Sequence, residues 1–347
     1  MKLNLLKQYN KIQVHYADDR HCMASCNMSL MFSIDSGENW NKFFLLPSNI
    51  IKRIICNFSL TRRLFRAGIH IVLPIGNHLC PDWIVVAENK VFRVSANGDS
   101  VQELFRIERG RRPLRKGIHV DKNHILFGEY WDNANRDAVK ILRFHLYSEK
   151  MEVMYVFKPK MVRHLHIVQK DPFSGLYWIS TGDQDHECII ATLDEESGCL
   201  TPIGQGSQKW RAVSFAFRQD AVYWGTDNNL GENQIWHFNR VDGSTRAIAN
   251  IIGPVYYNMS LDSYIIFGTA VEKGEGKQDG FGRLYAVDNN EKVNEVWRQR
   301  KDRWDPRMFG YGIFEFAEGL LSNKRFWVTE KGFENGLRSI LFELKND

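Results

Sequence analysis

The chain has 347 residues, of which 44% are hydrophobic, 13% aromatic and 25% charged, and its formal net charge is +5. This composition excludes disordered and fibrous proteins. No apolar run approaches the roughly 18 residues that a membrane-spanning helix needs. The N-terminal apolar stretch is too short for a signal peptide and the six cysteines are irregularly spaced. We therefore expect reduced thiols and a cytoplasmic location.

Taken in chain order, the predicted elements are short strands that recur with a period of roughly 40 to 50 residues. A β-branched run opens each repeat, for example at 68–72, 117–120, 165–168 and 212–215. The next run is rich in aromatic residues and ends in a small residue before an acid or threonine, as at 125–129, 176–183, 222–227, 265–269 and 326–330. Two further runs complete the repeat, as at 140–144 and 151–157. Four short antiparallel strands per repeat are typical of a β-propeller blade.

Six repeats begin near residues 68, 117, 165, 211, 255 and 311, and the preceding segment is long enough for one more. We predict a single all-β domain over 1–347 that forms a propeller of seven four-stranded antiparallel blades. The expected blades lie at about 8–50, 68–107, 117–157, 165–204, 211–251, 255–299 and 309–347. A propeller of six blades is the alternative. The last repeat lacks its outer strand, so a segment such as 3–6 or 12–15 is expected to close the ring. Residues 50–66 are the one place where a short helix is expected.

One turn carries a family resemblance. Ser33, Asp35, Gly37 and Trp40 fit the Asp-box pattern S-x-D-x-G-x-x-W, so the chain resembles the sialidase-like (BNR-repeat) propellers. In such a turn the Asp accepts backbone N–H bonds, the Gly supplies a positive φ, and the Trp packs between sheets. The resemblance implies a turn between the third and fourth strands of a blade and no activity.

A second resemblance concerns residues 222–227 with 235–246, which are similar to a YWTD repeat of the lipoprotein-receptor type with one extra glycine. Both resemblances imply propeller architecture and leave the function open. The early Arg-Ile-Pro element of sialidases is absent from the sequence, so sialidase activity is not expected.

Propeller topology predicts where a ligand would bind, because the first strand of a blade starts on the face where the second strand ends. In three successive repeats the first strand carries an arginine followed by a histidine three or four residues later: Arg66 with His70, Arg115 with His119, and Arg163 with His166. Later repeats offer Arg211 and Tyr256 at comparable places, and the second-strand ends offer Glu129 and Asp183.

These residue types suggest roles. Arginine can bind a carboxylate or sulfate through two hydrogen bonds, and histidine or tyrosine can transfer a proton. We predict as catalytic residues His166, His119 and Tyr256, and as substrate-binding residues Arg66, His70, Arg115, Arg163, Arg211, Glu129 and Asp183. His164 and His166 point the same way on a strand, and several imidazoles with Asp183 are a candidate site for a divalent metal. The alternative is that these histidines are core residues bonded to neighbouring backbone.

Charge favours an acidic partner. The connections that enter the first strands, residues 52–66, 106–116, 158–163, 209–211 and 298–307, hold 21 Lys and Arg against three acidic residues. Such a face attracts anions. We therefore expect a carbohydrate-active enzyme that binds an acidic oligosaccharide or polysaccharide, with lyase chemistry favoured over hydrolysis. The alternative is a non-catalytic propeller that binds a protein or polyanion; nucleic acid is disfavoured because no RNA-binding motif is present.

Overall fold

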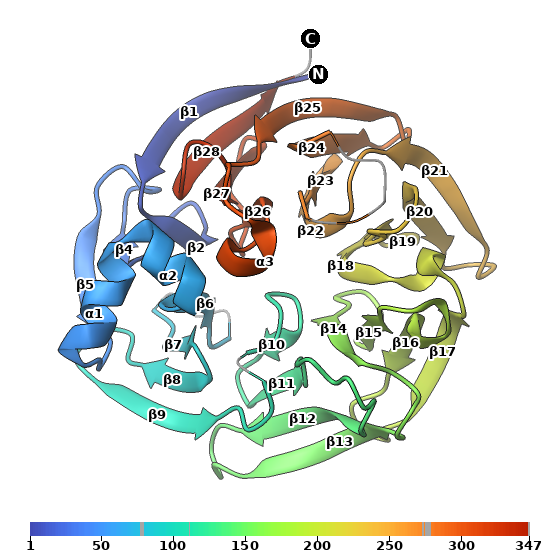
Figure 1. Ribbon diagram of the computed structural model, residues 1–347, viewed down its shortest axis with the longest axis horizontal. Coiled ribbons are helices and arrows are strands. Elements are labelled where there is room, and N and C mark those ends of the chain that lie inside the picture. The colour runs from blue at the N-terminus through green and yellow to red at the C-terminus, as the bar shows by residue number, and fades with distance from the viewer. Residues whose placement is uncertain (77–79, 111, 273, 275–278, 346–347) are drawn as a thin grey trace. The chain divides into compact units, whose positions relative to one another are not determined.

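The computed structural model describes residues 1–76, 80–110, 112–272, 274 and 279–345. Across these residues the strands form seven four-stranded antiparallel sheets, which are the blades of a β-propeller (Figure 1). The predicted fold class and the number of seven blades are thereby confirmed. Within the same described ranges, no helix is long and apolar enough to cross a membrane.

The chain divides into two compact units, which we describe separately. Unit 1 comprises Met1–Arg106 and the described residues from Leu261 onward. Its strands are β1 (Lys2–Asn10), β2 (Gln13–Ala17), β3 (Cys22–Cys26), β4 (Ser29–Ser33), β5 (Asn41–Leu45), β6 (Ile69–Pro74), β7 (Trp83–Ala87), β8 (Lys90–Val94), β9 (Val101–Arg106), β23 (Tyr264–Thr269), β24 (Phe281–Asp288), β25 (Val293–Arg300), β26 (Ile313–Phe316), β27 (Arg325–Lys331) and β28 (Arg338–Lys345). Its helices are α1 (Ile50–Asn57), α2 (Ser59–Phe65) and α3 (Pro306–Phe309).

Unit 2 comprises the described residues of Ile107–Ser260. Its strands are β10 (Ile118–Val120), β11 (His124–Gly128), β12 (Val139–His145), β13 (Met151–Phe157), β14 (His164–Lys170), β15 (Tyr177–Gly182), β16 (Ile189–Leu193), β17 (Leu200–Gln205), β18 (Ala212–Phe217), β19 (Ala221–Thr226), β20 (Asn233–Asn239) and β21 (Thr245–Ile251). Two short 3₁₀ turns, Asp185–Glu187 and Gln208–Trp210, follow β15 and β17. Strand β22 (Val255–Leu261) ends at the unit boundary and belongs to the sheet β22–β25.

The N-terminal strand completes the last sheet. β1 pairs antiparallel with β28 from Lys2↔Lys345 to Asn10↔Arg338, and Figure 1 shows the two strands side by side. The sheet order is therefore β1-β28-β27-β26. This pairing confirms the expected closure by an N-terminal segment, and it removes a row of unpaired backbone groups that would otherwise remain at the edge of β28.

The burial of each strand explains the sequence pattern. The second strands β7, β11, β15, β19 and β23 are buried at every residue, whereas the fourth strands β9, β13, β17 and β21 are largely exposed or half-buried. A strand with sheets packed on both of its faces has no solvent-exposed side, so its sequence is a continuous run of apolar residues. The core of each unit accordingly lies between neighbouring sheets, as in the unit 2 cluster that contains Ile141, Leu165 and Ile179.

The turn of residues 33–40 joins β4 to β5, the third and fourth strands of their sheet. Asp35 accepts hydrogen bonds from the backbone N–H of Glu38 at 3.0 Å and of Asn39 at 2.9 Å. Gly37 has φ +88°, and a Cβ there would lie 2.7 Å from Cζ2 of the buried Trp327. The turn is thus a tight contact between the sheet β2–β5 and the closing sheet of unit 1.

This packing makes Gly37 sensitive to substitution. We expect Gly37→Ala to lower the free energy of unfolding by about 3 kcal/mol, because a positive φ and a clash with a buried ring act together. Gly243→Ala is the control, since Gly243 has φ +71° with no atom within 4 Å of the added Cβ. It should cost only about 1 kcal/mol. Equal losses for the two variants in denaturant titrations would contradict the proposed contact.

Candidate functional site

Strand register brings the predicted side chains of unit 2 together. His164, the first residue of β14, pairs with Gly182, the last residue of β15. The preceding Arg163 and the following Asp183 are therefore neighbours, and Arg163 NH1 donates to Asp183 Oδ2 at 2.6 Å. The next sheet repeats this arrangement, because Ala212 pairs with Thr226 and so brings the flanking Arg211 and Asp227 together.

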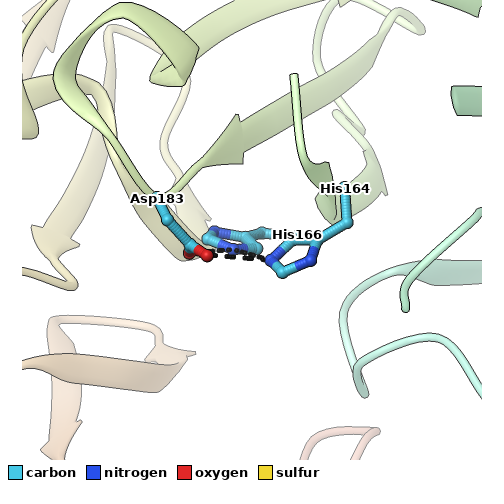
Figure 2. Close-up of side chains that lie close together, drawn as sticks. All are labelled: His164, His166 and Asp183. Carbon is cyan, nitrogen blue, oxygen red and sulfur yellow. Dashed lines mark hydrogen bonds and ion pairs between the residues drawn. The ribbon is translucent and has the colours of Figure 1, made fainter. Parts of the chain in front are cut away.

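Three ligand-type atoms meet at this point, as Figure 2 shows. His164 Nε2 lies 3.1 Å from His166 Nε2 and 3.6 Å from Asp183 Oδ1, and His166 Nε2 lies 3.8 Å from the same carboxylate oxygen. A point equidistant from three atoms with these separations lies about 2.0 Å from each of them, which is the ligand distance of a divalent transition metal. The separations of the three atoms therefore fit such an ion.

The hydrogen bond on the far side of His164 orients its ring. His164 Nδ1 lies 3.0 Å from the carbonyl oxygen of Trp131, and a carbonyl oxygen can only accept, so Nδ1 carries the proton. In the neutral imidazole the lone pair is then on Nε2, which faces His166 and Asp183. This arrangement, a backbone carbonyl behind an imidazole, is the usual support of a metal-binding histidine.

His166 lies at an irregularity of β14. The pairing with β15 shifts register between Leu165 and Ile167, which leaves His166 as the extra residue of a bulge. Bulges redirect side chains and are frequent beside functional sites. Burial, with a contribution from the neighbouring His164, lowers the pKa of His166 to about 3, so the ring is neutral at physiological pH and can act as a ligand.

Asp183 is the anionic centre of the site. Its burial opposes ionisation, but its contacts with His164, His166 and Arg211 hold its pKa well below the usual range. Arg211 NH2 lies 3.2 Å from Asp183 Oδ1. The backbone N–H of Asp183 donates to Glu187 Oε2 at 3.2 Å, which fixes the loop that follows β15.

Arg211 is shared between two carboxylates. Its NH2 group lies 3.2 Å from Asp227 Oδ2 as well as from Asp183 Oδ1. Burial raises the pKa of Asp227 to about 6 against the opposing effect of Arg211. Because the Arg211 side chain is only 9% exposed, it serves to hold the two carboxylates in place.

Arg163 is the accessible cation. Its side chain is 30% exposed, and its NH2 group bonds to Asp132, whose side chain is 80% exposed. A surface carboxylate therefore occupies one edge of the guanidinium, while the other edge is fixed on Asp183. The Asp132 contact is the one that a carboxylate ligand could replace.

Sequence reasoning missed several residues that follow β11. The ring of Tyr130 lies 4.3 Å from that of His164 and 6.2 Å from that of His166, measured between centroids. Trp131 supplies the carbonyl behind His164, and Asp132 binds Arg163. Their position in the repeat could have identified them. They directly follow Glu129 at the end of a second strand, and in the next repeat the loop that carries Asp183 occupies the same position.

The other predicted residues of unit 2 lie elsewhere. Glu129 Oε2 accepts from the N–H of Lys140 at 2.8 Å, and Arg115 is buried just before β10. His119 packs its ring edge-on against Tyr177 at 5.4 Å, and Tyr256 contacts the ring of Tyr257 at 6.1 Å. Thus the structure brings together Arg163, His166, Asp183 and Arg211, and it assigns His119 and Tyr256 to different contacts.

Two predicted residues belong to unit 1. Arg66 ends α2 in the left-handed conformation with φ +49°, and its carbonyl oxygen lies 3.0 Å from His70 Nε2. His70 is the extra residue at a register shift of β6, as His15 is in β2 and His166 is in β14. A histidine at a first-strand bulge is therefore a repeated feature of the blades, and His15 is the copy that the sequence did not single out.

A second group of ligand-type residues lies near the turn that follows β10. His124 Nε2 is 3.3 Å from Asp121 Oδ2 and 3.0 Å from Glu195 Oε1. Here Lys170 lies 3.0 Å and Arg143 3.6 Å from Glu195, so two cations already balance the two carboxylates. With a single imidazole, this group is the weaker candidate for a transition metal.

Comparison with known proteins identifies the fold. No protein-family model matches the chain. A stretch of 76 residues is 36% identical to a 1,4-alpha-glucan-branching enzyme of Emericella nidulans; it covers 21% of this chain and 10% of that enzyme. The chain thus spans about a tenth of the length of this curated relative.

Solved structures of the same fold include two lyases. An oligogalacturonate lyase in complex with manganese superposes with a TM-score of 0.62 at 9% identity, over 100% of this chain and 97% of that one. An oligogalacturonate lyase from Vibrio parahaemolyticus gives 0.59 at 9% identity, over 100% and 98%. At these identities the likeness establishes a shared β-propeller architecture.

The depressed pKa of His166 predicts a specific pH dependence of stability. In the unfolded chain the imidazole of residue 166 binds a proton below about pH 6.5, whereas in the folded protein it does so only below about pH 3. The free energy of unfolding therefore falls as the pH is lowered from about 6.5 to about 3. His166→Gln should reduce the slope of unfolding free energy against pH there by up to about 1.4 kcal/mol per pH unit. The measurement is denaturant unfolding from pH 4 to 8 with a chelator present.

The matched control is His186→Gln, because His186 is 72% exposed on the loop after β15. This variant should keep the slope of the parent protein between pH 4 and 6.5. An unchanged slope in His166→Gln would contradict a buried neutral imidazole at that position.

Proposed function

We propose that the chain is a metal-dependent lyase for acidic oligosaccharides, with its active site in unit 2. The observation that carries the proposal is the convergence of two imidazole nitrogens and one carboxylate oxygen, 3.1 to 3.8 Å apart, beside a partly exposed arginine. The likeness in fold to an oligogalacturonate lyase in complex with manganese supports the same chemistry.

His164, His166 and Asp183 would hold the metal. Two imidazole nitrogens and one carboxylate oxygen suit Mn²⁺, Fe²⁺, Co²⁺ or Zn²⁺, whereas Ca²⁺ and Mg²⁺ prefer oxygen ligands. When bound, such an ion would withdraw electron density from a substrate carboxylate. The Trp131 carbonyl supports the His164 ring from behind, and Glu187 holds the backbone of Asp183.

Arg163 would bind the substrate carboxylate. Its guanidinium keeps one edge on Asp183 and would exchange the exposed Asp132 for a uronate carboxylate on the other edge. A bidentate bond between guanidinium and carboxylate fixes both the position and the plane of the sugar's acid group. Arg211, which is nearly buried between two carboxylates, would act as a positioning residue for Asp183.

The reaction we propose is β-elimination. Neutralisation of the uronate carboxylate acidifies the proton on the adjacent C5. A base removes that proton, the electron pair forms a C4=C5 double bond, and the C4–O bond breaks with the leaving oxygen taking a proton. We assign the base to the phenolate form of Tyr130, whose ring centroid lies 4.3 Å from that of His164 and 6.2 Å from that of His166; His166 itself, with a pKa of about 3, is too weak a base for this step.

Two observations disfavour glycoside hydrolysis. A glycosidase needs one carboxylic acid that donates a proton and a second carboxylate at a defined distance. Asp183 is held ionised by its cationic neighbours, and Asp227 is buried at 4% exposure beside Arg211. Neither carboxyl group therefore suits the role of a solvent-accessible acid. A binding module without catalysis is the second candidate, and it predicts metal or uronate binding with no product.

Metal binding is the first test. Isothermal titration of the chelator-treated protein with Mn²⁺ or Zn²⁺ should give one strong site, and Asp183→Asn should weaken it by at least about tenfold. Asp121→Asn is the control, because it alters the equivalent carboxylate of the second group. Weakening by Asp121→Asn with no change in Asp183→Asn would reassign the metal to the group with His124.

Activity is the second test. The protein with Mn²⁺ should release unsaturated products from oligogalacturonate or another oligouronate, detected by ultraviolet absorbance of the new double bond. Arg163→Gln should lower kcat/KM by about 10² to 10³. Arg143→Gln, which changes an arginine of the second group, should leave the rate unchanged. Binding of oligouronates with no absorbance change would replace the lyase by a binding module.

A further inference from the structure

Helix α1 turns its apolar side to the solvent. Ile50, Ile51 and Ile54 are 73%, 64% and 53% exposed, while the one buried side chain of the helix is Cys56. A surface helix of a globular protein normally buries its apolar stripe and exposes its polar one. The Asn49 side chain accepts a hydrogen bond from the N–H of Lys52 at 2.8 Å, so the helix has a regular N-terminus and its exposed apolar face belongs to an ordered element.

The apolar surface continues over α2 and α3. Phe58, between the two helices, and Leu64 and Phe65 at the end of α2 are exposed, as is Met308 in α3. Arg63 Nε donates to the carbonyl oxygen of Phe309 at 2.5 Å, which ties α2 to α3 (Figure 1). We call the seven exposed side chains the apolar surface of unit 1: Ile50, Ile51, Ile54, Phe58, Leu64, Phe65 and Met308.

The charges of the segment that carries α1 and α2 are all of one sign, and beside α3 Asp305 pairs with Arg307. Residues 49–66 contain five basic residues and no acidic residue. Lys52 pairs with Glu88, and Arg63 pairs with Asp302, so these two cations are balanced within unit 1. Arg53 and Arg66 are exposed and have no carboxylate partner among the ion pairs of the described residues.

Exposed aliphatic and aromatic side chains on adjoining helices, here α1 with α2 and α2 with α3, indicate an interaction site. An apolar protein partner would strip water from the flanking guanidinium groups, which is unfavourable without matching carboxylates. An anionic lipid surface accepts both kinds of side chain, because apolar groups enter below the headgroups while arginines stay at the phosphates. Charge complementarity therefore selects the membrane over a second copy of the chain.

We propose that α1, α2 and α3 form a docking surface for an anionic phospholipid membrane, with α1 lying in the plane of the interface. Ile50, Ile54 and Phe58 are spaced four residues apart, so they lie in one line along the segment and can enter the lipid together. This proposal concerns unit 1 only and is independent of the metal site, so either can fail without the other.

The experiment is co-sedimentation of the full chain with vesicles of phosphatidylcholine alone or with about 30% phosphatidylglycerol at low salt. We expect binding to the anionic vesicles that weakens as salt is raised. The double variant Ile51→Asp with Ile54→Asp should reduce the partition coefficient by at least about tenfold, and Arg53→Glu by about tenfold. Both should retain the circular dichroism spectrum and melting temperature of the parent.

Val241→Asp is the matched control, because Val241 is 90% exposed in the turn between β20 and β21, away from the helices in sequence. It should bind vesicles as the parent does. No binding to either vesicle, or equal binding by the double variant, would overturn the proposal. A dimer seen by light scattering that the double variant dissolves, without vesicle binding by the parent, would also overturn it in favour of a second copy.

Discussion

The antiparallel register between the first and second strands of a blade decides where the functional side chains lie. The first residue of β14 is opposite the last residue of β15, and the same is true of β18 and β19. The residue that precedes the first strand of a blade must therefore lie beside the residue that follows the second strand. In unit 2 these positions carry Arg163 with Asp183 and Arg211 with Asp227. The backbone hydrogen bonds of the two sheets thus hold the ion pairs in place, and the position of these side chains depends little on the conformation of the loops.

Charge balance explains why these buried groups are tolerated. A buried carboxylate or guanidinium is costly unless it is paired and hydrogen-bonded. Asp183 pairs with Arg163 and Arg211, and Arg211 pairs with Asp183 and Asp227. Each of these charged side chains therefore has a partner of opposite charge. The His166 imidazole remains neutral because a positive charge on its buried ring would have to be desolvated beside His164 and Arg211. Neutral imidazoles beside an ionised carboxylate are the state in which all three can bind a metal.

The predictable part of the structure followed from periodic features. Continuous apolar runs mark the doubly covered second strands, and an acid directly after such a run, as at Asp183, marks the face of the site. The spacing of His164 and His166 predicts that their side chains share one side of β14. The closure by β1 followed from the missing outer strand of the last blade.

The rest depends on tertiary contacts that have no local signal. The Trp131 carbonyl that sets the His164 tautomer comes from a loop, and the bulge at His166 is a property of the pairing with β15. His119 resembles His166 in sequence, but β10 has only three residues, so His119 lies one residue from the turn that carries Asp121. Fewer basic residues of the connections are unpaired than their count suggests, because partners such as Glu88 and Asp183 lie outside the connections.

We propose that His164 Nε2, His166 Nε2 and Asp183 Oδ1 are the ligands of one divalent metal. The most direct measurement is an anomalous difference map from crystals grown with Mn²⁺. The account predicts a peak about 2 to 2.3 Å from all three atoms. A peak between Asp121, His124 and Glu195 instead, or no peak in unit 2 at saturating Mn²⁺, would contradict it.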